Sequence, residues 1–172
     1  QELAEYAQHI LNTSSMIAEL DIYLAFAQNA AKNNYVCPEM TDGKELVLKN
    51  ARHPVIEQIL KFGDFVANDI DLNDTTKRIM ILTGPNMSGK STYLRQTALI
   101  VIMAQIGSFV PCTEATIGIV DKIFTRIGAG DNLVAGESTF MVEMTETANI
   151  LNQYTDKSLI ILDNRIFIRK MV

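Results

Sequence analysis

The sequence predicts an α/β domain in which helices flank a mainly parallel sheet, preceded by one long helix. Three observations support this fold class. From residue 45 onward, short apolar segments alternate with segments of helical periodicity. A glycine-rich loop joins one apolar segment to a helix at 84–91. Residues 157–163, KSLIILD, form an apolar run that ends in an acid, which is typical of a buried parallel strand.

The first predicted element is a helix over residues 3–31. Its apolar side chains recur every three or four residues and therefore share one narrow stripe. The stripe comprises Leu3, Tyr6, Ile10, Thr13, Ile17, Leu20, Leu24, Ala27 and Ala31. The length of the helix and the narrow stripe favour a projecting, coiled-coil-like arm over a surface helix packed on a core.

A linker is expected to follow this helix, because residues 32–45 break the period with Asn, Pro and Gly. We therefore divide the chain into a helical part at 1–36 and a main domain at 37–172. The main domain is expected to contain two helices, at 89–106 and 139–153. Its expected strands are 45–51, 65–72, 78–84, 119–127 and 157–163.

Composition excludes several classes of protein. With 48% hydrophobic and 20% charged residues, the 172 residues have the composition of a folded globular domain. No apolar run is long enough to span a membrane, and the first residues do not resemble a signal peptide. The net charge of −5 argues against strong binding of nucleic acid by these residues alone. Cys37 and Cys112 lie far apart, as expected of buried thiols in a cytoplasmic protein.

Residues 84–91, GPNMSGKS, match the phosphate-binding pattern G-x-x-x-x-G-K-[ST] in full. The glycines let successive backbone N–H groups point at phosphate oxygens, and the following helix adds the positive end of its dipole. Lys90 is expected to reach the β- and γ-phosphates and Ser91 to bind Mg²⁺. The predicted nucleotide-binding residues of this segment are Gly84, Pro85, Asn86, Met87, Ser88, Gly89, Lys90, Ser91 and Thr92.

Asp163 closes the apolar run at 157–163, where P-loop enzymes place the acid that holds Mg²⁺ through water. Ser91 and Asp163 are therefore the predicted metal residues. The alternative for Asp163 is a turn or a helix N-cap just past a strand.

These motifs and their neighbours resemble the ATPase domain of the MutS family of DNA mismatch repair proteins. The resemblance covers the chain from about residue 1 to Asp163, including NARHPVIE at 50–57. Its longest segments are GPNMSGKSTYLRQTALI at 84–100, AQIGSFVPC at 104–112 and DKIFTRIGAGDNLVAGESTFMVEMTETANIL at 121–151. It implies an ABC-type P-loop ATPase fold, with the helix at 3–31 as the end of the family's lever helices.

The resemblance also implies two further site residues and a set of partners. Phe65 matches the aromatic residue that stacks on adenine, although core packing is the alternative. Ser138 matches the serine that reaches the γ-phosphate bound by a second subunit, although alone it reads as a helix cap. ATP or ADP with Mg²⁺ is thus expected as cofactor, in a homodimer. Mismatched DNA, bound through domains outside these residues, and a MutL-type repair factor are the expected partners, in the cytoplasm or on the nucleoid.

The chain departs from the family pattern at Asn164. The family has a glutamate there, which acts as the base for the attacking water. An asparagine can hydrogen-bond water but cannot take its proton. We therefore assign no catalytic residue and expect weak nucleotide binding with little turnover.

The segment 164–172 matches nothing in the family pattern, and the switch histidine of the family has no counterpart. A frameshift or aberrant junction, a designed fragment and an unusual complete gene product are the three explanations. An incomplete ATPase domain would expose an edge of the strand at 157–163 and promote self-association.

Two rival functions remain. The first is a non-catalytic interaction module that binds a partner through the helix at 3–31. The second is a different ABC-type ATPase. STFMVEMTE at 138–146 argues against the second, because a loop beginning Leu-Ser-Gly-Gly is usual there.

Overall fold

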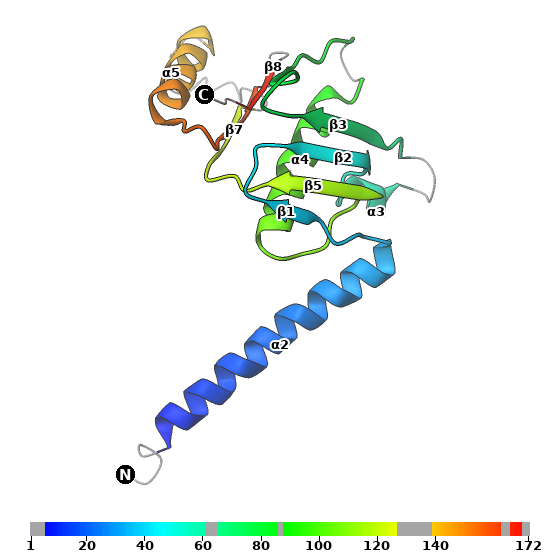
Figure 1. The fold of residues 1–172 in the computed structure, drawn as a ribbon, viewed down its shortest axis with the longest axis vertical. Helices are drawn as coiled ribbons and strands as arrows, with labels where there is room; N and C mark the ends of the chain where they lie inside the picture. The colour runs from blue at the N-terminus through cyan, green and yellow to red at the C-terminus, as the bar shows by residue number, and fades with distance from the viewer. Residues whose placement is uncertain (1–5, 61–64, 86–87, 127–138, 163–165, 170–172) are drawn as a thin grey trace.

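The computed structural model describes residues 6–60, 65–85, 88–126, 139–162 and 166–169. Two four-stranded sheets form the body of the molecule, and one long helix projects from it (Figure 1). The helices are α2 (Ala7–Asn33), α3 (Ile56–Ile59), α4 (Lys90–Gln105) and α5 (Thr139–Gln153). The strands are β1 (Glu39–Thr41), β2 (Leu46–Ala51), β3 (Asn68–Leu72), β4 (Ile79–Met80), β5 (Glu114–Gly118), β6 (Ile123–Arg126), β7 (Leu159–Leu162) and β8 (Ile166–Arg169).

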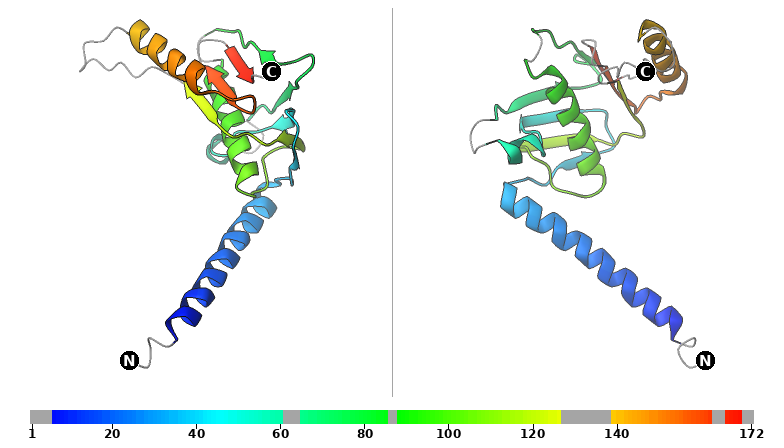
Figure 2. Two further views of the ribbon diagram at one scale, coloured as in Figure 1. Left: turned by 60° about the vertical axis from the view of Figure 1, so that its left-hand side comes forward. Right: turned by 180° about the vertical axis from the view of Figure 1, so that it is seen from behind.

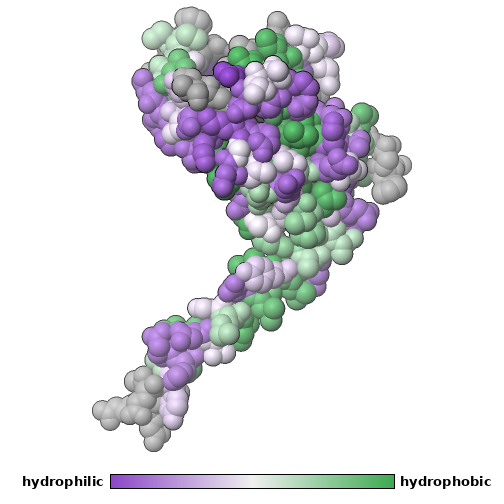
Figure 3. All heavy atoms as spheres, viewed as in Figure 1, coloured by the Kyte–Doolittle hydropathy of each residue, from purple (hydrophilic) through white to green (hydrophobic). Residues whose placement is uncertain are grey.

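Helix α2 is the predicted projecting arm. Of its residues only Ala30 is buried, and apolar side chains such as Leu20 are left exposed. Hydrophobic residues therefore form part of its surface (Figure 3). The helix ends at Asn34, which has a left-handed φ of 52° and donates its N–H to the Ala30 carbonyl. The alternative of a surface helix packed on a core is thereby excluded.

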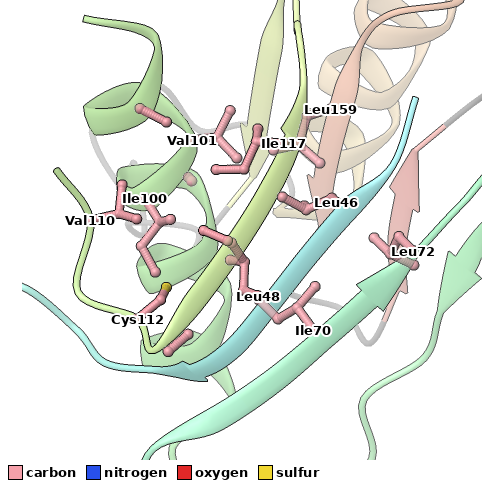
Figure 4. Close-up of a cluster of buried hydrophobic side chains, with 14 of the residues drawn as sticks. Leu46, Leu48, Ile70, Leu72, Ile100, Val101, Val110, Cys112, Ile117 and Leu159 are labelled. Atoms are coloured by element: carbon pink, nitrogen blue, oxygen red, sulfur yellow. The ribbon is translucent and has the colours of Figure 1, made fainter. Parts of the chain in front are cut away.

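The first sheet has the order β1-β5-β2-β3, and α4 covers one of its faces (Figure 2). Alternate residues of β2 point inward, as a strand with one buried face requires. Leu48 of β2 and Ile117 of β5 meet Ile100 of α4 in the core (Figure 4). All three side chains are fully buried, so this face is the main apolar contact of the domain.

The second sheet has the order β4-β8-β7-β6. The prediction of a mainly parallel arrangement is wrong for the described strands, because only β1–β5 and β6–β7 are parallel pairs. The other four pairs are antiparallel. One antiparallel pair, β2–β3, joins two strands that the sequence predicted. The other three contain β5 or β8, which lie in segments where the sequence predicted no strand.

Strand β7 lies in the middle of its sheet. The expectation of an exposed edge at 157–163 is therefore wrong, since β6 pairs with one side of β7 and β8 with the other. Two further expectations also need correction. The strand before the glycine loop covers only Ile79–Met80 rather than 78–84, and Cys37 is exposed while Cys112 is buried. Within the described ranges, no helix is both long and apolar enough to cross a bilayer.

Candidate functional site

Two glycines shape the loop between β4 and α4. Gly89 is the N-cap of α4 and has a φ of 86°, a left-handed conformation that favours glycine. Gly84 has a φ of 155°, and a Cβ added there would lie 3.0 Å from the Ser88 hydroxyl oxygen. The loop therefore brings the chain directly into the first turn of α4. Because the N-cap is a glycine, it provides no side-chain cap to the backbone N–H groups of that turn.

Lys90 is the first residue of α4 and folds back over the loop. Its ammonium nitrogen donates hydrogen bonds to the carbonyl oxygens of Gly84, at 2.7 Å, and Pro85, at 2.6 Å. A positive charge is thus held where the dipole of α4 also presents its positive end. Both features favour an anionic ligand at this point.

A cavity of about 740 Å³ opens beside the loop. Its volume lies within the range of small-molecule sites, about 300–1,000 Å³. Its wall includes Phe65, Ser88, Gly89, Lys90, Thr92 and Tyr93. The wall of this cavity therefore combines an aromatic ring with a cation beside a helix N-terminus.

The structure brings together some of the residues predicted for the site. Phe65 shares the cavity wall with Ser88, Gly89, Lys90 and Thr92. Gly84 and Pro85 are not on the cavity wall, but their carbonyl oxygens accept hydrogen bonds from Lys90. Ser91 is half-buried and is not on the wall either. The predicted residues Asn86, Met87, Ser138 and Asp163 lie outside the described residues, as does Asn164.

Tyr93 is a wall residue that the sequence reasoning missed. Its hydroxyl donates a hydrogen bond to the Asp69 carbonyl at 2.9 Å, which joins α4 to β3. Burial, with a smaller effect from the Asp69 carboxylate, raises the pKa of Tyr93 to about 12, so the hydroxyl remains a donor at neutral pH. Its position three residues after Lys90 places it one helical turn further along the same face. The spacing of three residues from Lys90 is the sequence signal that could have identified Tyr93 as a wall residue.

Asp69 also lies on the cavity wall. The sequence did not identify it, because nothing in its segment distinguishes it from an ordinary acidic residue on the surface. Its carboxylate accepts a 2.8 Å hydrogen bond from the Asn50 backbone N–H, and Lys49 lies 3.6 Å away. The Asn50 N–H and, to a smaller extent, Lys49 lower the pKa of Asp69. The carboxylate is therefore ionised at neutral pH.

Gln96 forms part of the same wall at the second turn of α4. Its side chain is fully buried, and neither amide atom has a hydrogen-bond partner in the part of the chain that the structure describes. An unpaired buried amide costs about 1–3 kcal/mol.

The described residues contain no cluster of three or more His, Cys, Asp or Glu side chains that could hold a metal ion.

Comparisons with known proteins agree on one family. The family model described as MutS domain V matches residues 80–165. DNA mismatch repair protein MutS of Protochlamydia amoebophila is 54% identical over 162 residues, which cover 94% of this chain and 19% of that protein. The MutS proteins of Flavobacterium johnsoniae and Caldicellulosiruptor bescii are 55% and 56% identical over 94% and 91% of this chain, covering 19% and 18% of those proteins. The chain thus spans less than a fifth of the length of these relatives.

Proposed function

Because the chain belongs to the MutS family of DNA mismatch repair proteins and matches its domain V over residues 80–165, we propose that it binds ATP or ADP with Mg²⁺. The observation that carries this proposal is the cavity that Phe65 shares with Gly89 and Lys90. An aromatic ring suits a purine base, and a lysine at a helix N-terminus suits phosphates. The two features lie on one wall, as one nucleotide requires.

Each residue has a defined part in this proposal. Backbone N–H groups of the loop and of the first turn of α4 hold the phosphates, and Lys90 neutralises their charge. Thr92 contacts the α-phosphate and Phe65 stacks on the base. Ser91 and Asp163 hold Mg²⁺, which supplies charge stabilisation at the phosphates when it is bound.

Turnover is proposed to be low. The residue after Asp163 is Asn164, whose amide can orient water but cannot accept its proton. Loss of one general base lowers a rate by about 10²–10⁴-fold. Nucleotide binding is therefore proposed as the main activity of this chain.

The wider role is proposed from the longer relatives. In a protein of that length, ATP binding would be coupled to recognition of mismatched DNA by other domains and to a MutL-type repair factor. Two copies would associate through this domain, with Ser138 contacting the γ-phosphate held by the other copy.

Calorimetric titration tests nucleotide binding directly. ADP and a non-hydrolysable ATP analogue, each with Mg²⁺, are titrated into the wild-type chain and into Lys90→Ala. We expect binding by the wild type and loss of binding in the variant. Lys77→Ala is the matched control, because Lys77 is an exposed lysine paired with Asp71 outside the cavity wall. Equal binding by wild type and Lys90→Ala would refute the proposed site.

A non-catalytic interaction module is the second candidate. The exposed apolar residues of α2, among them Ile10, Ile17 and Leu24, favour it. This function requires no affinity for phosphate. A folded wild-type chain that binds neither nucleotide in the same titration would favour it over the first proposal.

A further inference from the structure

Gln96 extends the cavity wall along α4, away from the glycine loop. It follows Lys90 by six residues, which correspond to about 9 Å along the axis of the helix. Both residues line the same cavity. The cavity therefore continues beyond the first turn of α4, and a ligand with its phosphates at Lys90 has room to extend toward Gln96.

The Gln96 amide differs from the other polar groups of this wall. The Lys90 ammonium donates to two loop carbonyls, and the Tyr93 hydroxyl donates to the Asp69 carbonyl. The Gln96 side chain is fully buried, yet within the described residues neither its oxygen nor its nitrogen has a hydrogen-bond partner. Buried polar groups of folded proteins nearly always have partners. An unpaired amide on a cavity wall therefore points to a partner that enters the cavity.

The surroundings of this amide favour a specific hydrogen bond. Apolar side chains share the wall with it, among them Phe65, Met80 and Leu82. A hydrogen bond is stronger in such surroundings than in water, and leaving it unmade is costly. The amide is also shielded from water before any ligand binds. A ligand group that pairs with it therefore replaces no hydrogen bond to water at the amide.

We propose that Gln96 is a specificity-determining residue that recognises the edge of an adenine base. The inference rests on the proposed nucleotide binding and names the part of the nucleotide that the cavity selects. A glutamine amide offers one acceptor and one donor side by side. Its oxygen accepts a hydrogen bond from the 6-amino group of adenine, and its nitrogen donates to the adjacent ring nitrogen.

This assignment gives Phe65 and Gln96 separate tasks. In the proposed site Phe65 contacts the face of the base, a contact that every base can make. Gln96 contacts the edge, where bases differ in their donors and acceptors. Rotation of the glutamine side chain turns its amide toward the ligand.

Comparison of two ligands measures this recognition in the wild-type chain. ADP and the 5′-diphosphate of purine riboside, which lacks the 6-amino group, are each titrated calorimetrically with Mg²⁺. The two ligands share their phosphates, their sugar and the face of their ring. We expect ADP to bind about tenfold or more tightly, because the analogue leaves the buried amide oxygen unpaired. GDP is a poorer probe, since a rotated amide can donate to the oxygen that guanine carries at this position.

Gln96→Met removes the amide and keeps nearly the same shape. In this variant we expect ADP to bind about tenfold more weakly, with affinity equal to that of the analogue, while urea denaturation shows no loss of stability. A residue that serves only in packing would not give this combination. Thr97→Val is the matched control, because Thr97 is the next residue of α4, is also fully buried and is not on the cavity wall. It should keep the wild-type preference for ADP.

The outcomes separate this inference from the proposed function. ADP binding by the wild type without a preference over the analogue overturns the role of Gln96 and leaves nucleotide binding intact. A preference that persists in Gln96→Met also overturns it. If Gln96→Met does not fold, Gln96→Asn, which withdraws the amide by one methylene group, is measured in its place with the same expected loss of preference. No ADP binding by the wild type refutes both proposals.

Discussion

The ammonium nitrogen of Lys90 lies 2.7 Å from the carbonyl oxygen of Gly84, at the opposite end of the same loop. The loop is therefore closed by its own lysine, whose second hydrogen bond goes to Pro85. A compact ammonium group with rotatable donors can satisfy both carbonyls from one point. The geometry of the loop thus depends on lysine itself and not only on a positive charge.

Lys90→Arg should weaken nucleotide binding although it preserves the charge. The planar guanidinium is larger and cannot take the place of an ammonium between two neighbouring carbonyls. Loss of a charged hydrogen bond costs about 1.5–3 kcal/mol, so we expect the dissociation constant for ADP to rise by about tenfold or more. Calorimetry measures it, with Lys77→Arg as the control. Unchanged affinity would mean that charge alone is sufficient.

The variant Phe65→Ala distinguishes stacking of Phe65 on a base from packing of Phe65 in the core. If Phe65 stacks on adenine, ADP affinity should fall by about 1–3 kcal/mol, while the affinity for inorganic triphosphate stays the same. Competition titrations with the two ligands measure this difference. The neighbouring Val66, which is 79% exposed on the same wall, provides the control Val66→Ala. A parallel loss of both affinities and of stability would assign Phe65 to the core.

Gln96→Met should stabilise the domain. Methionine has nearly the shape of glutamine but no amide to leave unpaired, and replacing an unsatisfied buried amide is worth about 1–3 kcal/mol at most. Urea denaturation should therefore give a higher midpoint for this variant, with an unchanged slope. A lower midpoint would indicate that the amide has a hydrogen-bond partner in the folded protein.

Stability should fall in mild acid because of His53. Its Nδ1 accepts the backbone N–H groups of Val55 and Ile56, each at 3.3 Å, so the folded state requires the neutral ring. Burial is the largest of the effects that lower the pKa of His53 below 6.5. The unfolded chain takes up the proton first, so the stability present above pH 6.5 is lost as pH falls through the lower pKa of the folded state.

Denaturation at several pH values measures this loss. His53→Asn keeps an acceptor for the two N–H groups but does not titrate, and it should flatten the dependence on pH. His9→Gln changes an exposed residue of α2 and should leave the pH dependence of stability unaltered. If both variants retain the wild-type slope, another group is responsible.

Asn164→Glu should raise ATP turnover by about 10²–10⁴-fold, the usual contribution of one general base. Phosphate release under saturating ATP is the measurement. The double variant Lys90→Ala and Asn164→Glu should return to the background rate. No gain in the single variant would show that another feature of the chain limits hydrolysis.

Long periodic elements could be predicted from the sequence, and short or locally irregular ones could not. Helix α5 was predicted with its observed bounds, Thr139–Gln153, because its helical pattern is uninterrupted. Strand β1 was assigned to a linker, since Pro38, Asp42 and Gly43 enclose only three residues. The directions of the strands could not be predicted either, because the sequence of a short strand does not show whether its partner is parallel or antiparallel.

The candidate site likewise has parts that the sequence predicts and parts that it does not. The loop pattern predicted a helix from residue 89, within one residue of the observed start of α4 at Lys90, and it did so from chemistry that is local in sequence. The contact between Asn50 and Asp69 spans 19 residues and depends on a left-handed asparagine. Asparagine is enriched in this conformation, but its presence alone does not show which asparagine of a chain adopts it. The parts of the site that depend on tertiary contacts therefore required the structure.

The length of helix α2 has one geometric consequence for any rotation about its Asn33 end. Its 27 residues give it a length of about 40 Å at 1.5 Å per residue. A rotation of about 10° around the Asn33 end then moves the Ala7 end by about 7 Å, by simple trigonometry on that length. A small rotation at the Asn33 end thereby becomes a displacement longer than one helical turn at the other end.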